Sequence, residues 1–217
     1  MVEIRRNEGF DMPDTPNMES SPMRDPLSAM RIHTHAEPPI FPSYWSPDRP
    51  IVLDVGCHRG TFLVSLAETR PDHDILGIER QSSRVTRVLR KIERLGLPNA
   101  WALQGEAYET LKRLPAARAA EIHILFPDPW PKRRHAPRRL VNTEFLVECA
   151  RVLHPVGLLR IVTDDAPYFE QVRQTAATAE AFTPSTETLV FPETEFQKKF
   201  IEQGKPFFEI VLHRKTS

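Results

Sequence analysis

The sequence predicts an α/β protein with a mainly parallel sheet. From residue 50 onward, short apolar runs alternate with longer amphipathic stretches. Such alternation is typical of βαβ units, in which a helix connects two parallel strands. The first 48 residues lack this pattern and contain eight of the 21 prolines. We therefore expect a Pro-rich, largely disordered extension over residues 1–48, with residues 41–45 docking on the domain, and one folded domain over residues 49–217.

The individual elements follow from these runs in chain order. Five apolar runs predict strands at residues 51–55, 75–79, 100–104, 121–126 and 158–162. The stretches between and after them predict helices at residues 61–69, 82–95, 107–114, 141–152 and 167–179. The remaining chain holds a short segment at residues 188–191, a helix near residues 195–203 and a strand at residues 207–212 that returns to the sheet as a hairpin.

The helix at residues 82–95 has the clearest amphipathic pattern. Val85, Val88, Leu89 and Ile92 recur at helical spacing, and Gly96 provides a C-terminal stop. Its cations fall mostly on the opposite face: Arg84, Arg87, Arg90, Lys91 and Arg94. We interpret these cations as a solvated helix surface rather than an RNA site.

Composition limits the classes of protein and the compartment. The chain has 29 Lys and Arg against 29 Asp and Glu, but a nucleic-acid binder needs only one basic face, and five of the eight residues 132–139 are Lys or Arg. The two cysteines, Cys57 and Cys149, match neither a disulfide framework nor a zinc pattern, so no metal is expected. No membrane-spanning stretch or secretory signal is evident, and we expect a cytoplasmic protein.

The most informative segment is residues 126–140, Phe-Pro-Asp-Pro-Trp-Pro-Lys-Arg-Arg-His-Ala-Pro-Arg-Arg-Leu. It follows a predicted strand, and ligands of open α/β sheets bind at the carboxyl ends of strands. Pro127 and Pro129 restrict the backbone of Asp128 between them. The segment closely resembles the signature of the tRNA (guanine-N7)-methyltransferase family, of the bacterial single-chain kind. The resemblance implies a Rossmann-like class I methyltransferase fold: a mainly parallel seven-stranded sheet with an antiparallel C-terminal strand and helices on both faces.

The cofactor implied by this resemblance is S-adenosylmethionine. A glycine turn follows the first strand, and acids stand at the ends of three successive strands. Carboxylates there suit a cofactor that carries a sulfonium cation and no phosphate, and Glu79 holds the position that commonly takes ribose hydroxyls. The expected cofactor-binding residues are Asp54, Gly56, Gly60, Glu79, Glu106 and Asp128. The sequence departs from the family pattern at three positions. His58 stands where the family has glycine, Asp54 where it has glutamate, and Glu106 where it has aspartate.

The resemblance also assigns residues to the RNA substrate. It makes Asp128 the catalytic residue and implies substrate contacts from Lys132, Asp164, Thr194 and Gln197. Gln197 stands where the family has Glu. The implied RNA-contacting loop contains Arg133, Arg134, His135, Arg138 and Arg139. Trp130 could stack on a base or anchor its own loop, and both roles stay open.

The implied reaction is methyl transfer to N7 of guanine 46 in the tRNA variable loop. Guanine N7 has a lone pair and no proton, so the enzyme must mainly position the base and stabilise charge. Asp128 and Asp164 would accept hydrogen bonds from N1 and N2 of the guanine. One alternative is a non-catalytic RNA-binding protein with a decayed cofactor site, which His58 and Gln197 would favour. Another is a nicotinamide-dependent oxidoreductase, disfavoured by the glycine pattern and the basic loop. The expected partner is tRNA, with no obligatory protein partner, in a monomer or homodimer.

Overall fold

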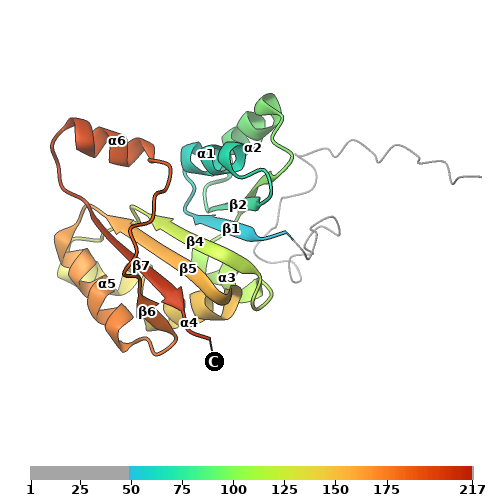
Figure 1. The fold of residues 1–217 in the computed structure, drawn as a ribbon. Coiled ribbons are helices and arrows are strands. Elements are labelled where there is room, and N and C mark those ends of the chain that lie inside the picture. The colour runs from blue at the N-terminus through green and yellow to red at the C-terminus, as the bar shows by residue number, and fades with distance from the viewer. Residues whose placement is uncertain (1–48, 217) are drawn as a thin grey trace, which may run out of the picture.

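A computed structural model describes residues 49–216, which form a seven-stranded sheet with helices on both faces (Figure 1). The strands lie in the order β3-β2-β1-β4-β5-β7-β6. Strands β1 to β5 pair parallel with one another, and β7 pairs antiparallel with both β5 and β6. This confirms the predicted fold class. The expected extension and the docking of residues 41–45 lie outside the described residues.

The first half of the chain matches the predicted elements closely. The strands are β1 (Ile51–Val55), β2 (Asp74–Glu79), β3 (Ala100–Gln104) and β4 (Ala119–Leu125). The helices are α1 (Thr61–Thr69), α2 (Ser82–Leu95) and α3 (Ala107–Arg113). Gly96 ends α2 in the left-handed conformation, which confirms it as the predicted C-terminal stop.

The second half contains more departures from the prediction. It comprises the 3₁₀ helix η1 (Arg133–Arg138), α4 (Thr143–Val152), β5 (Leu153–Thr163), α5 (Ala166–Thr178), β6 (Phe182–Pro184), α6 (Glu195–Glu202) and β7 (Phe208–Arg214). Both η1 and β6 were missed by the sequence prediction. Residues 188–191 belong to no helix or strand. No helix within residues 49–216 has the length and apolar character needed to cross a membrane.

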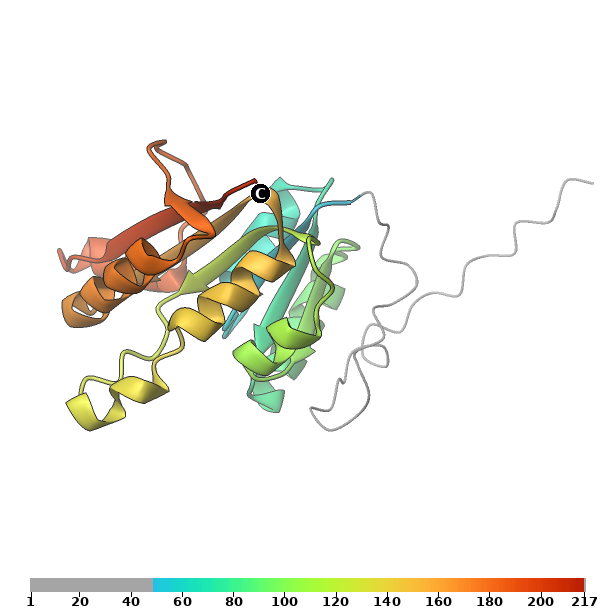
Figure 2. The ribbon, with the colours of Figure 1, turned by 90° about the horizontal axis from the view of Figure 1, so that it is seen from below.

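The two faces of the sheet bury separate apolar cores. Because side chains alternate along a strand, Val52 faces α1 and α2, whereas Leu53 joins the core beneath α3, α4 and α5. Figure 2 shows these last three helices in front of the sheet, with η1 projecting beyond it. Helix α6 lies on the same side as α1, and the Thr61 hydroxyl donates a hydrogen bond to Glu195 Oε1 at 2.7 Å. This contact holds α6 over the carboxyl ends of the strands.

Candidate active site

A cavity of about 460 Å³ opens at the carboxyl ends of β1, β2, β3 and β4. We call it the strand-end cleft. Its lining residues come from the turns and loops after these strands and from α6: Val55, Gly56, His58, Glu79, Gln81, Arg84, Gly105, Glu106, Phe126, Asp128, Trp130, Arg138 and Phe196 among others. Strands β1 and β4 are adjacent although distant in sequence, which is where the strand order reverses. Open α/β sheets bind ligands at such a reversal.

The turn after β1 exposes its backbone to the strand-end cleft. Gly56 has φ 82° and Gly60 has φ 68°, which are left-handed conformations that favour glycine. A side chain at Gly56 would meet no neighbour within 4 Å, but one at Gly60 would collide with Val88. Gly56 therefore keeps backbone open towards the cleft, while Gly60 allows α1 to pack closely on α2.

His58 also has a left-handed backbone, with φ 50°. Its ring lies 6.0 Å from that of Phe196. Burial lowers the pKa of His58 below its ordinary value, and the nearby Arg84 and Arg59 lower it further. These effects favour the neutral form of the imidazole.

Asp54 is almost entirely buried beneath the turn, on the α1 face of β1. Burial raises the pKa of its carboxyl group to about 7, a backbone hydrogen bond from Leu63 partly opposes the shift, and the charge of Glu79 adds to it. Within the described residues, the Asp54 Oδ2 atom has no hydrogen-bond partner. A buried acceptor without a partner favours the arrival of a donor or a positive charge nearby.

Glu79 and Glu106 bring their carboxylates to the strand-end cleft in different ways. Glu79 is 4% exposed and is held by the backbone N–H of Gln81 at 2.9 Å and by Arg84 Nη1 at 3.4 Å. Glu106 is exposed and caps α3, accepting a hydrogen bond from the backbone N–H of Glu109 at 3.0 Å. The Glu79 carboxylate is thus fixed in orientation by its two donors. The Glu106 carboxylate also caps helix α3.

The segment after β4 is held in an unusual backbone conformation. Phe126 has φ 52° and Trp130 has φ 45°, and left-handed conformations in bulky residues are uncommon and costly. The Phe126 ring packs at 5.6 Å from Phe196 and 5.4 Å from Phe200. Trp130 lies edge-on to His135 and beneath the guanidinium of Arg138, 5.1 Å from the ring centroid. These contacts fix both ends of the Pro-Asp-Pro segment and leave the Asp128 side chain exposed to the cleft.

The cations of the basic segment have different surroundings. Arg139 donates to the carbonyl oxygen of Pro129 at 2.7 Å and to Gln171 Oε1 at 2.6 Å, so it clamps the loop onto α5. Arg134 is exposed and donates a hydrogen bond to His135 Nε2 at 3.2 Å, and Arg138 stacks on Trp130. The side chain of Arg133 lies outside the described residues. The RNA-contacting role of this segment stays a prediction.

The predicted substrate residues are not all brought together. Lys132 and Asp164 are exposed, but neither lines the strand-end cleft. Thr194 and Gln197 are buried in a capping box at the start of α6: each side chain bonds the backbone N–H of the other at 3.0 Å. Their polar atoms are thus engaged in starting the helix.

Phe196 and Arg84 are among the cleft residues that sequence reasoning missed. Phe196 lies inside the motif chosen for Thr194 and Gln197, yet Phe196 lines the strand-end cleft and those two residues do not. Arg84 lies at the start of α2, and its ion pair with Glu79 could have been inferred from the short separation between them. The signal was present in both cases, but sequence alone does not show which side chain faces the cleft.

The fold and this cleft define the protein as a methyltransferase. Residues 48–210 match the family model Methyltransf_4, described as "Putative methyltransferase". The solved structure of the 16S rRNA methyltransferase KamB is similar in fold, with a TM-score of 0.57 and 19% identity over 77% of this chain and 88% of that one. An SAM-dependent methyltransferase from Aquifex aeolicus gives a TM-score of 0.56 and 20% identity, covering 76% and 82% of the two chains.

Curated relatives define the family more narrowly. The tRNA (guanine-N(7)-)-methyltransferase of Levilactobacillus brevis is 30% identical over 187 residues, covering 82% of this chain and 84% of its own. The one of Latilactobacillus sakei is 29% identical over 184 residues, covering 80% and 85%. The chain belongs to the tRNA (guanine-N7)-methyltransferase family, as the 126–140 segment predicts.

Proposed function

We propose that the protein transfers the methyl group of S-adenosylmethionine to N7 of guanine 46 in the variable loop of tRNA. Membership of the family supports the reaction, and the names of its relatives supply the tRNA substrate and the N7 atom. The observation that carries the proposal is the strand-end cleft, which Glu79 and Asp128 line from neighbouring halves of the sheet. A cofactor at one carboxylate and a base at the other would share a single cavity.

The residues on the β1 and β2 side fit S-adenosylmethionine. This cofactor supplies an electrophilic methyl group on a sulfonium cation. Gly56 offers open backbone, and the fixed carboxylate of Glu79 can accept hydrogen bonds from ribose hydroxyls. The unpartnered Oδ2 of Asp54 lies beneath the same turn and favours positive charge close by. Glu106, which lines the cleft after β3, would lie beside the adenine.

The residues on the β4 side would orient the base. Asp128 can accept hydrogen bonds from N1 and N2 of guanine, which directs N7 towards the methyl group. The same carboxylate offsets the positive charge that develops on the ring, so it acts through electrostatic stabilisation rather than as a base. Asp164, at the end of the neighbouring strand β5, remains a second candidate for these contacts.

Labelled methyl transfer tests the proposal. The protein would be incubated with radiolabelled S-adenosylmethionine and bulk tRNA, followed by nucleoside analysis. We expect 7-methylguanosine, and we expect it to disappear when a tRNA transcript carries adenine in place of guanine 46. Tight tRNA binding with no labelled nucleoside would instead support the alternative of a non-catalytic RNA-binding protein. Label in another nucleoside would contradict the assignment of the base.

A further inference from the structure

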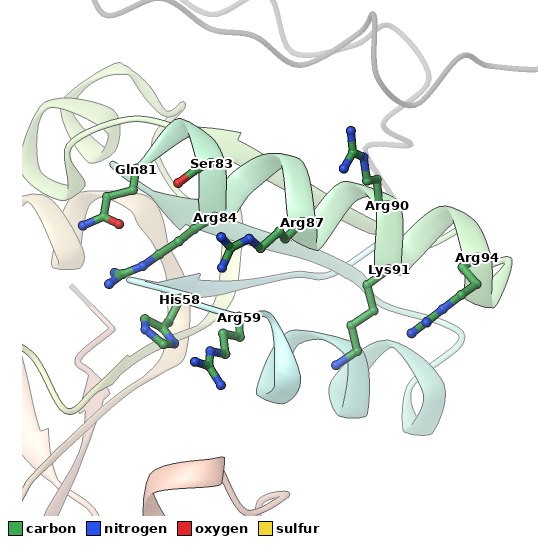
Figure 3. A pocket seen from close by; sticks show the side chains of 9 residues that line it. All are labelled: His58, Arg59, Gln81, Ser83, Arg84, Arg87, Arg90, Lys91 and Arg94. Carbon is green, nitrogen blue, oxygen red and sulfur yellow. The ribbon is translucent and has the colours of Figure 1, made fainter.

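We propose that α2 carries a second RNA-binding surface, which binds the phosphate backbone of the tRNA beside the strand-end cleft. The inference rests on the proposed function in taking tRNA as the RNA. The surface is a cavity of about 670 Å³ between α2 and the turn after β1, and we call it the α2 groove (Figure 3). Six cations line it: Arg59, Arg84, Arg87, Arg90, Lys91 and Arg94.

The cations of the α2 groove lack the partners that a solvated helix surface normally provides. Other helices pair their cations with a glutamate one turn away, such as Lys112 with Glu109 and Arg173 with Glu170. In the α2 groove, only Arg84 has an ion pair among the described residues, with Glu79. No Asp or Glu belongs to the lining within this part of the chain. Uncompensated like charges repel one another, and a polyanion would relieve that repulsion.

The cations also form a directed stripe. Figure 3 shows Arg84, Arg87, Lys91 and Arg94 pointing from α2 towards the side where Arg59 lies. Successive positions in this stripe are three or four residues apart, so the cations repeat about every 5 Å along the helix axis. From Arg84 to Arg94 the stripe extends about 15 Å at 1.5 Å per residue. A linear array of positive charge fits an extended polyanion better than a compact ligand.

The α2 groove leads directly into the strand-end cleft. His58, Gln81 and Arg84 line both cavities. The stripe departs on the β2 side of β1, whereas the basic segment around η1 follows β4 on the opposite side. A nucleotide held at Asp128 would therefore have cations on both sides of it. The α2 groove would bind phosphates on one side of the target guanine, and Arg134 and Arg138 those on the other.

The double variant Arg87→Ala/Lys91→Ala tests the groove, because both residues lie in the stripe and neither touches Glu79. A matched control is Lys112→Ala/Arg173→Ala, which removes the same net charge from α3 and α5. We would measure tRNA affinity across salt concentrations for the full-length parent and both variants. Loss of two phosphate contacts should make the slope of log K against log salt shallower by about 1.4 to 1.8 units. The control should keep the parental slope.

Two further measurements separate the possible outcomes. In methylation assays, the groove variant should show a higher KM for tRNA, with parental kcat and parental affinity for S-adenosylmethionine. The exchange Arg87→Lys/Lys91→Arg should restore the salt slope, because it keeps both charges. If the groove variant keeps the parental salt slope and methylates normally, the α2 groove does not bind RNA, and the proposed function still stands. Absence of 7-methylguanosine in the parent would overturn the proposed function, while the slopes would still report on the groove.

Discussion

At the residue scale, Asp128 shows how local constraint can prepare a reactive group. Its two flanking prolines limit the backbone, and the left-handed Phe126 and Trp130 are held by ring contacts on either side. Strain of this kind persists only where the surrounding structure enforces it, and it concentrates at functional sites. In the proposed reaction, the carboxylate would therefore meet the guanine with little reorganisation left to make.

We expect Asp128→Asn to lower the rate of methyl transfer by about 10²–10³, as is typical when one well-placed electrostatic group is lost. The amide keeps the shape but presents a donor to guanine N1 and N2 and cannot offset the charge on the ring. Single-turnover assays on tRNA would measure the effect, with S-adenosylmethionine affinity and melting temperature as controls. A parental rate would limit Asp128 to ordering its loop.

Glu79→Ala tests the other half of the strand-end cleft. Loss of a hydrogen bond to a charged group costs about 1.5–3 kcal/mol, so cofactor affinity should fall by roughly ten- to a hundredfold. Because Arg84 would lose its partner in this variant, Arg84→Ala is a suitable control for the ion pair alone. Calorimetry that gives equal losses for both variants would remove the direct ribose contact from Glu79.

His58 allows backbone strain to be separated from side-chain contacts. His58→Gly and His58→Ala both remove the ring, but only glycine adopts φ 50° without cost. We expect the alanine variant to be less stable than the glycine variant by about 1 kcal/mol in urea unfolding. We also expect tighter S-adenosylmethionine binding in the glycine variant, since it opens the turn. Equal stabilities would mean that the turn relaxes when the ring is removed.

The sequence identified the strand-end acids because charge at the end of an apolar run is a local signal. Asp54 and Glu79 lie within the last two residues of their strands, and Glu106 and Asp128 follow theirs by two and three residues. What the sequence could not show was burial and mutual contact. Asp54 is beneath the turn rather than exposed to the cleft, and the capping box of α6 engages Thr194 and Gln197. Both outcomes depend on packing between segments distant in sequence.

At the scale of elements, the loop from Pro129 to Leu140 depends on Arg139. Its guanidinium joins Pro129 to α5 through Gln171 and lies 4.9 Å from the ring centroid of Tyr168. Tyr168 is buried, and its hydroxyl accepts a hydrogen bond from the backbone N–H of Val141 at 3.0 Å. The loop is thus attached at both of its ends to the core beneath the sheet.

Arg139→Ala should therefore reduce stability as well as RNA binding. Loss of its charged hydrogen bonds should lower the free energy of unfolding by about 1.5–3 kcal/mol. The matched variant Arg134→Ala removes one exposed cation from the same segment and should leave stability within about 0.5 kcal/mol. Urea unfolding of both variants would measure the difference. If both unfold like the parent, Arg139 is no clamp.

The elements that the sequence missed have identifiable causes. Strand β6 has only three residues and contains Pro184, so its apolar pattern is too short to recognise. The helix η1 contains Pro137 and three arginines, a composition that favours a loop. Strand β5 begins directly after α4, five residues earlier than predicted, and includes Val156 in a left-handed conformation. No apolar pattern in the sequence marks this early start.

At the scale of the whole molecule, Asp54 should make stability depend on pH. Its folded pKa of about 7 lies above the ordinary aspartate value of 3.8, so the folded state binds the proton more tightly. Its contribution is complete below about pH 4 and is lost as the pH rises to about 7. The loss is on the order of 4 kcal/mol, at 1.36 kcal/mol per pKa unit. Asp54→Asn should remove this part of the dependence.

Unfolding in urea between pH 4 and 8 would test this. The stability of the parent relative to Asp54→Asn should decline with rising pH and then become constant above about pH 7. Glu170→Gln is a suitable control, because Glu170 is exposed and its arginine neighbour lowers its pKa. That variant should follow the parental profile above pH 5. Parallel profiles for the parent and Asp54→Asn would mean that Asp54 is ionised throughout.

The position of β7 has a consequence for biosynthesis. It lies between β5 and β6, so β6 cannot join the sheet until residues 208–214 are available to pair with it. Chains fold progressively as they leave the ribosome, and here the β1–β4 half can form first. Helix α6 supplies Phe196 to the strand-end cleft and directly precedes β7 in the chain. The C-terminal end of α6 is therefore anchored to the sheet only once β7 has paired. A nascent chain could therefore assemble its glycine turn and Glu79 well before it completes the cleft, so catalytic competence would arrive only after β7 has been synthesised.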